Sequence, residues 1–377
     1  MINFIATTTF GLESIVKREA INLGFENIKV EDGAVFFSGT IADIPKANLW
    51  FRSADRILIV MARFKALEFE ELFQGVHQVD WADYLPKDAN FVTAGKSIKS
   101  QLSSVPACQK ITEKAIVEKL KLTYKGVSTF SKTGKKYKIQ VALLKDIVTI
   151  TLDTSGVGLH KRGYRDKQLA APIKETLAHA LIDLSYYKKD RIFIDPTCGS
   201  GTIPIEAAFK AKNIAPGLNR RFVSEGWEFI DSKYWKDARK DAYSKIDTNA
   251  KIEIYGSDID EKAIEIAKRN SKVAGVDDCI RFKVAPLKEL DTSILNYATC
   301  ICNPPYGERI GELAEVERLY WDMGEVFTKN KTLSSYILTS HEEFEKFYGQ
   351  KANKKRKLFN GNVKVDYYQY FGEKPKK

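Results

Sequence analysis

The first stretch that could do chemistry is a glycine-containing turn between an expected strand and an expected helix, Asp-Pro-Thr-Cys-Gly-Ser-Gly-Thr at residues 195–202. Gly199 and Gly201 let the backbone bend sharply and approach a ligand closely at the positive N-terminus of the helix. Asp195 adds a carboxylate at the end of the strand, which disfavours a pyrophosphate and favours a cationic amino-acid group. A purely structural turn is the alternative interpretation.

A second acidic group follows the next expected strand, in Gly-Ser-Asp-Ile-Asp at residues 256–260. A carboxylate at such a strand end can accept hydrogen bonds from both hydroxyls of a ribose. Asp258 is the better candidate, because Asp260 suits the cap of the following helix, although capping is an alternative role for Asp258 too. Asp258 lies 63 residues after Asp195, against about 20 in a dinucleotide-binding fold. Residues 215–247 are therefore expected to be an insertion.

A third position is marked by two prolines directly after an apolar strand, in Cys-Ile-Cys-Asn-Pro-Pro-Tyr-Gly at residues 300–307. Prolines end a strand abruptly and free backbone carbonyls from pairing. The amide oxygen of Asn303 and the carbonyl of Pro304 are then two acceptors at the sheet edge, beside the ring of Tyr306. Two acceptors and a ring suit a planar base with an exocyclic NH₂ group, each acceptor taking one N–H. An inert turn is the alternative.

These three positions require strands that end at one edge of a sheet. From residue 158 onward the pattern alternates between helix and strand, which predicts a doubly wound parallel sheet covered on both faces. The expected helices cover residues 174–187, 203–212, 261–274 and 313–328. The expected strands cover residues 191–194, 252–256, 298–302 and 363–371.

Two smaller α+β units are expected before residue 158. In the first, strands over 3–8, 34–38 and 56–64 alternate with helices over 12–23 and 41–49. In the second, the expected elements are helices over 69–79 and 108–122 and strands over 90–93, 137–144 and 146–153. The last two strands are joined by a tight turn at Lys145-Asp146.

Composition narrows the class of protein. The chain has 377 residues, of which 44% are hydrophobic and 29% charged, enough for two or three domains. It has no apolar run of membrane-spanning length and its first residues lack the pattern of a signal peptide, so neither a transmembrane helix nor secretion is expected. Five cysteines form no Cys-x-x-Cys pair, which predicts reduced thiols, a cytoplasmic protein and no metal site.

Positive charge is concentrated in two stretches of a chain whose net charge is +11. Residues 96–138 hold eleven lysines against two glutamates, and residues 351–377 hold nine basic residues against two acidic ones. Concentrated positive charge favours a polyanionic partner such as nucleic acid. Two solvated lysine-rich faces are the alternative.

The candidate ligand-binding stretches resemble known methyltransferase motifs. Residues 195–202 resemble the S-adenosylmethionine-binding motif I of class I methyltransferases, and residues 303–306 resemble motif IV of the amino-methyltransferases. Beyond these motifs, residues 158–165, 171–177 and 303–309 are similar to the bacterial large-subunit ribosomal RNA guanine-N2 methyltransferases. Such proteins are often labelled N6-adenine-specific DNA methylases, because motif IV alone does not separate the two.

The upstream lysine-rich stretch extends the resemblance over nearly the whole chain. Residues 95–102 and 108–111 resemble the THUMP RNA-binding domain of the same enzymes. The resemblance implies an α/β, Rossmann-like class I methyltransferase domain over residues 157–377. It also implies a ferredoxin-like domain over residues 1–60 and a THUMP domain over residues 61–156. The implied activity is S-adenosylmethionine-dependent methyl transfer to an exocyclic base amine, guanine N2 of 23S ribosomal RNA.

The resemblance also implies roles for individual residues. The catalytic residues would be Asn303, Pro304 and Tyr306. S-adenosylmethionine would be held by Asp195, Cys198, Gly199, Gly201, Thr202, Asp258, Ile259, Pro172 and Glu175. RNA would be contacted by Lys96, Lys99, Lys110, Arg162, Arg165, Lys355 and Arg356, the last two in a turn expected before residues 363–371. Neither a metal nor a membrane is an expected partner.

Rival functions stay open at this point. An adenine-N6 DNA methyltransferase would use the same motif IV, but it would leave a THUMP-like domain without a role. A nicotinamide-dependent oxidoreductase would also be doubly wound, but it does not account for Asn-Pro-Pro-Tyr. A non-enzymatic RNA-binding protein is disfavoured because both motifs are intact.

Overall fold

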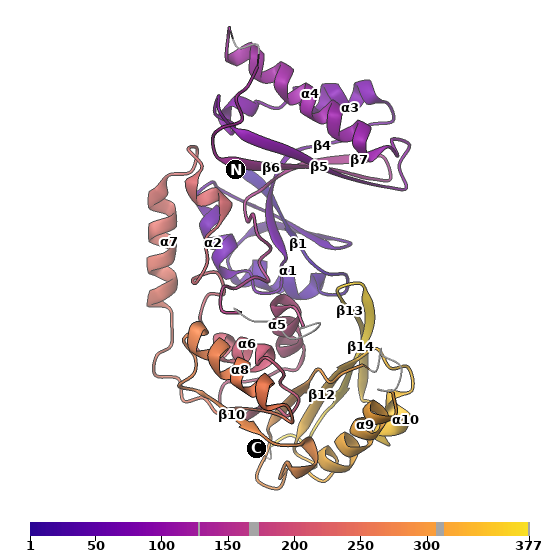
Figure 1. Ribbon diagram of the computed structural model, residues 1–377. Helices are drawn as coiled ribbons and strands as arrows, with labels where there is room; N and C mark the ends of the chain where they lie inside the picture. Colours follow the sequence, from indigo (N-terminus) through magenta and orange to yellow (C-terminus); the bar gives the residue numbers. More distant parts are fainter. Residues whose placement is uncertain (127–128, 166–172, 307–312, 376–377) are drawn as a thin grey trace. The chain divides into compact units, whose positions relative to one another are not determined.

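A computed structural model of the chain describes residues 1–126, 129–165, 173–306 and 313–375 (Figure 1). The chain divides into two compact units. The first unit contains residues 1–7, 17–159 and 221–240. The second unit contains residues 8–16, 160–220 and the chain from residue 241 onward. Among the described helices, none combines the length and the apolar character needed to cross a membrane.

The first unit is built on one seven-stranded sheet with the order β2-β3-β1-β4-β7-β6-β5. Its strands are β1 (Ile2–Thr7), β2 (Glu26–Glu31), β3 (Ala34–Gly39), β4 (Arg56–Lys65), β5 (Asn90–Ile98), β6 (Lys136–Leu144) and β7 (Ile147–Asp153). The helices in this part of the chain are α1 (Glu13–Asn22), α2 (Asp43–Trp50), α3 (Phe69–His77) and α4 (Val105–Thr123).

Strand β4 joins the two expected α+β arrangements into one sheet. It pairs antiparallel with β1 along Arg56–Ile59 and with β7 along most of its length. The register with β7 shifts between Val60 and Ala62, so the domain boundary expected after residue 60 falls at a β-bulge inside a strand. Strands β5 and β6 pair in parallel, as a crossover through α4 requires.

The β6–β7 hairpin confirms the tight turn expected from the sequence. Its two loop residues, Lys145 and Asp146, have φ values of 50° and 64°, and Leu144 pairs with Ile147. Positive φ at both central residues is the signature of a type I′ turn, whose twist matches that of the flanking strands.

Residues 221–240 lie between α6 and β9 in the sequence, yet they pack within the first unit. Trp227 stacks on Tyr137 of β6 with ring centroids 4.9 Å apart. Its indole N–H donates to the carbonyl of Lys136 at 3.0 Å. The expected insertion over residues 215–247 is therefore present, and much of it is part of the unit that carries the first lysine-rich stretch.

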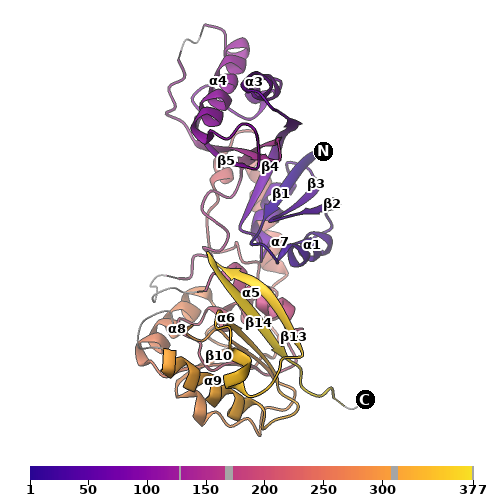
Figure 2. The ribbon, with the colours of Figure 1, turned by 90° about the vertical axis from the view of Figure 1, so that its right-hand side faces the viewer.

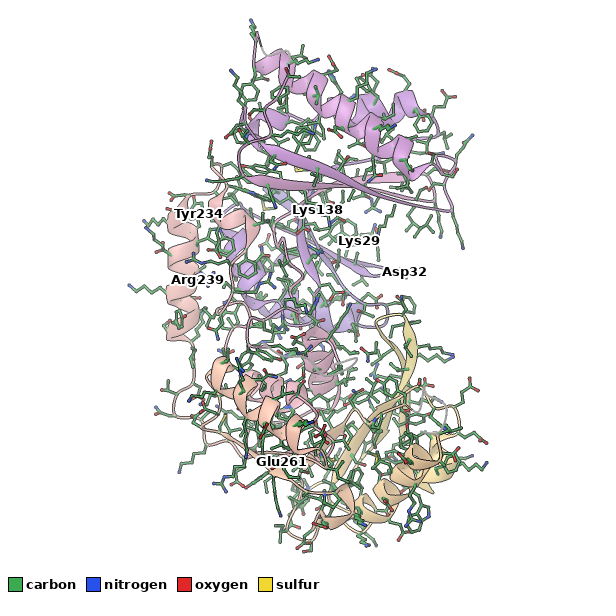
Figure 3. All side chains as sticks on the ribbon, viewed as in Figure 1. Lys29, Asp32, Lys138, Tyr234, Arg239 and Glu261 are labelled. Carbon is green, nitrogen blue, oxygen red and sulfur yellow. The ribbon has the colours of Figure 1, made fainter. Side chains whose placement is uncertain are left out.

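Helix α7 (Ser232–Ser244) begins inside this inserted segment. Arg239, which lies on α7 (Figure 3), forms an ion pair with Glu225 at 2.6 Å. Arg221 pairs with the same carboxylate at 3.1 Å. The segment is thus held by its own charges as well as by Trp227.

The second unit is a doubly wound sheet with the order β10-β9-β8-β11-β12-β14-β13. Its strands are β8 (Phe193–Asp195), β9 (Ile254–Asp258), β10 (Ile280–Val284), β11 (Thr299–Cys302), β12 (Ser334–Thr339), β13 (Lys354–Asn360) and β14 (Val363–Tyr370). The helices that lie wholly within this unit are α5 (Glu175–Leu184), α6 (Thr202–Ala211), α8 (Glu261–Ala274), α9 (Leu313–Phe327) and α10 (Phe344–Tyr348) (Figures 1 and 2). Strands β8 to β12 are parallel, and β14 runs antiparallel between β12 and β13.

The sheet is buried as a doubly wound fold requires. All four residues of β11 are buried, and three of them, Cys300, Ile301 and Cys302, are apolar. Helix α9 packs Val316, Tyr320 and Met323 into the core cluster that contains β11 residues Cys300 and Cys302. The fold class expected from the alternating pattern is confirmed.

One expectation about an element is wrong, and two strands are missing from those expected. The basic run 354–357 is not in a turn, because it begins strand β13, which pairs along its length with β14. Strand β13 is an edge strand of its sheet. Lysines are common on edge strands, because their charge discourages pairing with another chain. The sequence patterns also do not predict β2 or β12, of which β2 is a largely exposed edge strand.

Candidate active site

The glycine-containing turn connects β8 to α6 in the geometry that its sequence requires. Gly199 and Gly201 have φ values of 51° and 81°. A Cβ atom at Gly201 would lie 3.0 Å from the Cβ of Ala267 and 3.1 Å from the ring of Phe282. Glycine is therefore favoured at position 201, because its φ is positive and because α8 and β10 approach the turn closely. The turn is also held by Cys198, whose N–H donates to the Ser257 carbonyl at 2.9 Å.

Strand register places three polar side chains at one edge of the sheet. Asp195 is opposite Gly256 of β9, and its neighbour Ile194 is opposite Cys300 of β11. Asp258 lies two residues after Gly256, and Asn303 lies three residues after Cys300. The ends of β9, β8 and β11 thus bring Asp258, Asp195 and Asn303 together at the point where the strand order reverses, which is where doubly wound sheets bind ligands.

Asp258 holds the glycine-containing turn through its carboxylate. Its carboxylate accepts the N–H of Gly199 at 2.9 Å and the N–H of Asp260 at 3.0 Å. Asp260 is the helix cap, since it accepts the N–H of Lys262 at the start of α8. The neighbouring Ile259 side chain is 75% exposed.

Asp195 is almost completely buried. It is 1% exposed and accepts the N–H of Thr197 at 3.2 Å. Burial raises the pKa of its carboxyl well above the ordinary value, and the nearby Asp258 raises it further. The pKa of the Cys198 thiol is raised for the same first reason, burial, so this sulfur is not an ionised nucleophile.

The Asn-Pro-Pro-Tyr loop at the end of β11 is fixed by a buried tyrosine. Tyr320 of α9 is 0% exposed, donates its hydroxyl to the carbonyl of Pro305 at 3.1 Å and lies 2.8 Å from the hydroxyl of Thr339. Burial raises the pKa of Tyr320 to about 12, so it stays a donor. Neither Tyr320 nor Thr339 is expected from the sequence, because their pairing depends on α9 packing across β11 and β12.

The polar groups of this loop are already engaged with one another. The hydroxyl of Tyr306 donates to the amide oxygen of Asn303 at 2.6 Å. The amide nitrogen of Asn360, the last residue of β13, donates to that hydroxyl oxygen at 3.4 Å. Pro304 is buried, whereas Asn303 and Tyr306 are partly exposed. The Tyr306 hydroxyl is therefore part of the hydrogen bonding of this loop, whereas the sequence predicted a role for the ring alone.

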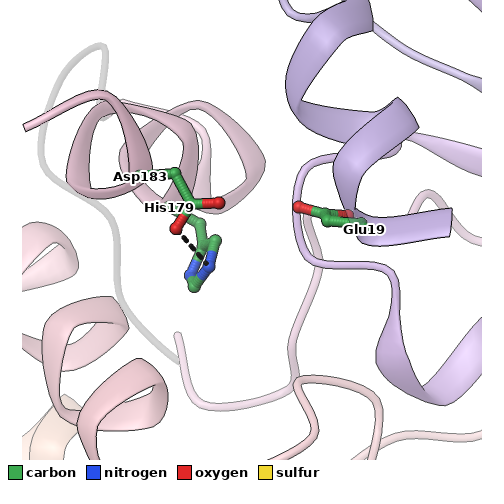
Figure 4. Close-up of side chains that lie close together, drawn as sticks. All are labelled: Glu19, His179 and Asp183. Atoms are coloured by element: carbon green, nitrogen blue, oxygen red, sulfur yellow. Dashed lines mark ion pairs between the residues drawn. The ribbon is translucent and has the colours of Figure 1, made fainter. Parts of the chain in front are cut away.

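Buried charged and polar side chains form a network around Glu206 of α6. The carboxylate of Glu206, which is 0% exposed, is 3.3 Å from both the Arg162 Nε and the Tyr164 hydroxyl. Its second oxygen is 3.4 Å from Nδ1 of His179. On the other side of the ring, Nε2 of His179 faces Asp183 at 3.7 Å, the ion pair drawn in Figure 4. The network ties the residues after the linker at 158 to helices α5 and α6.

The expectation that Arg162 and Arg165 bind RNA is wrong. The side chain of Arg162 is 2% exposed and that of Arg165 is 5% exposed. Arg165 donates to the hydroxyl of Thr202 at 2.6 Å and to the carbonyl of Ile173 at 2.9 Å, and it lies 3.6 Å from Glu175. Buried ion pairs rather than phosphates account for both arginines.

Glu175 begins α5 and is also buried, at 1% exposed. Burial raises the pKa of its carboxyl, although the charge of Arg165 opposes that shift. Through Arg165 and Thr202 it lies next to the start of α6. Pro172, the other residue expected on this side of the cofactor, lies outside the described residues, as does the end of the extended motif after Tyr306.

The expected RNA-binding lysines of the first unit are placed at its surface. Lys96 lies on β5, Lys99 follows that strand with a φ of 48°, and Lys110 lies on α4, and all three are exposed. In the second unit, the ammonium group of Lys355 is 3.1 Å from Asp366 and 3.0 Å from the Tyr368 hydroxyl. Burial lowers the pKa of Lys355, but these two partners outweigh it and raise the value overall. Arg356, next along β13, is only partly exposed.

Comparison of the sequence with known protein families assigns the chain to one of them. Residues 162–369 match the family described as "RMKL-like, methyltransferase domain". The chain belongs to this methyltransferase family. Residues 3–58 match the "RlmL ferredoxin-like domain", and residues 66–153 match the THUMP domain. The resemblance and the fold expected from the sequence are thus confirmed for this RMKL-like protein.

Individual relatives match nearly the whole chain. The chain is 50% identical over 370 residues to "Putative RNA methyltransferase YpsC" of Bacillus subtilis, and the match covers 98% of this chain and 96% of the relative. It is 32% identical over 376 residues to "Ribosomal RNA large subunit methyltransferase K/L" of Shewanella baltica. In that second case it covers 98% of its own length but 53% of the relative, so the chain spans about half of such K/L proteins.

Solved structures agree with this assignment. A predicted N6-adenine-specific DNA methylase from Listeria monocytogenes is 49% identical, with a TM-score of 0.94 over 99% of this chain and 96% of that one. SMU.472, described as "a putative methyltransferase complexed with SAH", is 45% identical, with a TM-score of 0.93 over 100% and 99% of the two chains. The label of DNA methylase expected for such proteins is therefore found among these structures.

Proposed function

We propose that this RMKL-like protein transfers the methyl group of S-adenosylmethionine to an exocyclic amine of large-subunit ribosomal RNA, at N2 of a guanine. The observation that carries the proposal is the position of the Asn303–Tyr306 loop at the end of β11, beside the carboxylates that end β8 and β9. Relatives named as RNA methyltransferases support RNA as the substrate class.

The residues at the ends of β8 and β9 fit S-adenosylmethionine. Asp258 would accept the ribose hydroxyls, since an ionised carboxylate has about four acceptor positions and backbone N–H groups occupy two. Ile259, which is 75% exposed, would cover the adenine. Buried Asp195 would face the cationic amino-acid end, with Cys198, Gly199, Gly201 and Thr202 lining the turn and Pro172 and Glu175 bordering it. The bound cofactor supplies a methyl group on a positively charged sulfur.

The Asn303 amide oxygen and the Pro304 carbonyl would accept the two N–H bonds of the target amine. An aromatic amine is a poor nucleophile, because its lone pair is delocalised into the ring. Two acceptors favour a pyramidal nitrogen whose lone pair leaves the plane of the base, and the ring of Tyr306 would hold that plane. One well-placed polar group of this kind contributes roughly 10²–10³ in rate.

A base that is stacked or paired hides its amine, so the target would have to leave the stack to reach this loop. The first unit would hold RNA by its exposed lysines, Lys96, Lys99 and Lys110, through backbone charge and shape. Lys355 and Arg356 on β13 would add contacts near the catalytic loop. We assign the ferredoxin-like, THUMP and methyltransferase domains to residues 1–60, 61–156 and 157–377, and the cytoplasm as the place of action.

The test is methyl transfer from labelled S-adenosylmethionine to a 23S ribosomal RNA transcript and, in parallel, to duplex DNA. We expect label in the RNA and none above background in the DNA, and the Asn303→Ala protein should label neither. Equal labelling of RNA and DNA would favour the adenine-N6 DNA methyltransferase instead. Tight NAD binding without S-adenosylmethionine binding would favour an oxidoreductase.

A further inference from the structure

Three side chains at the catalytic loop form a chain of hydrogen bonds that runs across the sheet. Asn360 donates from Nδ2 to the hydroxyl oxygen of Tyr306 at 3.4 Å. Tyr306 donates its single hydroxyl proton to Oδ1 of Asn303 at 2.6 Å. Asn303 follows β11, whereas Asn360 ends β13, which is the edge strand of the same sheet.

The direction of this chain is fixed by its first donor. A carboxamide nitrogen has protons and no lone pair to offer, so the Tyr306 oxygen must accept from Asn360. The tyrosine proton then points to Asn303, where only the amide oxygen can accept it. The hydrogen bonds therefore hold the Asn303 carboxamide with Oδ1, and not Nδ2, beside Tyr306.

This orientation matters for the proposed reaction. An amide oxygen has two acceptor positions, so one can take the Tyr306 proton while the other takes an N–H of the target amine. A rotated carboxamide would present its own NH₂ group to that amine, and two donors would face each other. Removing a partner so that a donor is left unpaired costs more than the hydrogen bond itself contributes.

Secondary structure and a buried side chain hold both ends of this series of hydrogen bonds in place. Asn360 pairs with Val363 across a two-residue turn whose first residue, Gly361, has a φ of 63°. On the other side, Tyr320 holds the loop through the carbonyl of Pro305. Asn360 is partly buried, whereas Asn362 in the same turn is exposed. The position of Asn360 is therefore set by the β13–β14 hairpin.

We propose that Asn360 is a positioning residue for methyl transfer, which acts through Tyr306 to keep the acceptor oxygen of Asn303 toward the target amine. The inference rests on the proposed function. It assigns a role in the active site to the hairpin tip, which lies 57 residues beyond Asn303 in the sequence. It also means that the Tyr306 hydroxyl contributes to the reaction in addition to the ring.

The test compares single-turnover methyl transfer to ribosomal RNA, at saturating S-adenosylmethionine, in Asn360→Ala, Asn360→Asp and the matched control Asn362→Ala. Asn360→Ala should slow the reaction about tenfold, the value of one net hydrogen bond. Asn360→Asp should slow it more, because a carboxylate would take the tyrosine proton away from Asn303. Asn362→Ala should match the wild type, and calorimetric S-adenosylmethionine affinity should be the same in all four proteins.

A double-mutant cycle with Asn303→Asp separates positioning from a structural role. Both oxygens of a carboxylate accept, so its orientation no longer matters, and adding Asn360→Ala to Asn303→Asp should change the rate less than twofold. A structural role would cost the same factor in both backgrounds. Should Asn303→Asp be inactive, the order Asn360→Asp slower than Asn360→Ala decides.

The inference is overturned if Asn360→Ala is within twofold of the wild type, if its cost is equal in the two Asn303 backgrounds, or if Asn360→Asp is the faster variant. Each of these results leaves the proposed function intact, because the wild type still labels RNA. A wild-type protein that binds S-adenosylmethionine but transfers no methyl group to RNA would instead overturn the proposed function, and the positioning role with it.

Discussion

The two sides of the candidate active site differ in what holds their polar groups. On the cofactor side, Asp258 and Asp195 accept hydrogen bonds from backbone N–H groups of Gly199 and Thr197 within or beside the same turn. On the base side, Asn303 is held by the side chain of Tyr306, which depends in turn on Asn360 from a distant strand. Backbone contacts survive many substitutions nearby, whereas a chain of side chains fails when any member changes.

The largest expected effect lies on the base side. Asn303→Ala removes one of two acceptors for the target amine and should lower single-turnover methyl transfer at least about a hundredfold. S-adenosylmethionine affinity should be unchanged, because the cofactor side does not depend on this side chain. Asn303→Asp keeps an acceptor and should retain partial activity. A near-normal rate in Asn303→Ala would contradict the role of this loop.

The next effect lies on the cofactor side. Asp258→Ala should weaken S-adenosylmethionine binding by about 1.5–3 kcal/mol, the value of a charge-assisted hydrogen bond, which is roughly 10- to 150-fold in affinity. Asp258→Asn should lose less, because it can still accept the N–H of Gly199. Calorimetry measures both, with circular dichroism as the control for folding. An affinity within twofold of the wild type in Asp258→Ala would exclude the ribose assignment.

A smaller, pH-dependent effect is expected from Asp195. Burial raises the pKa of this carboxyl, so below that raised value the ligand-free protein holds a proton there. A cationic ligand group favours the ionised form, so S-adenosylmethionine binding should release the proton and tighten as the pH rises, by at most about tenfold per unit. Calorimetry in buffers of different ionisation enthalpy detects the proton. The assignment fails if Asp195→Asn shows the same pH dependence as the wild type.

The smallest effects are expected at single surface lysines. Lys96→Ala, Lys99→Ala or Lys110→Ala should each reduce the slope of log affinity for RNA against log salt by up to roughly one unit. Lys29→Ala, which changes an exposed lysine paired with Glu31 on β2, serves as the control. The methyl-transfer rate at saturating RNA should not change. If a variant that combines Lys96→Ala, Lys99→Ala and Lys110→Ala binds RNA normally at several salt concentrations, these lysines are only a solvated face.

The sequence predicts features whose cause is local. The turn at residues 195–202, the cap at Asp260 and the hairpin at Lys145 follow from short-range geometry, and the structure has them. Features that depend on long-range packing are not predictable in this way. Arg162 is basic and lies in a charged stretch, but its burial against Glu206 is set by the packing of α6.

The same limit applies to the hairpin tip. Gly361-Asn362 between two runs of strand-forming residues is a turn signal that could place the β13–β14 hairpin. Nothing in that signal indicates that Asn360 meets Tyr306. That contact requires β13 to lie at the edge of the sheet beyond β14 and β12, a position fixed only by the complete strand order.

The most direct test of the central claim is the identity of the methylated nucleoside in 23S ribosomal RNA, measured by mass spectrometry in cells with and without this protein. We predict that one N2-methylguanosine is lost without the protein, and is restored by the wild type and not by Asn303→Ala. Unchanged guanine methylation of the RNA, together with a loss of N6-methyladenine from DNA, would contradict the account.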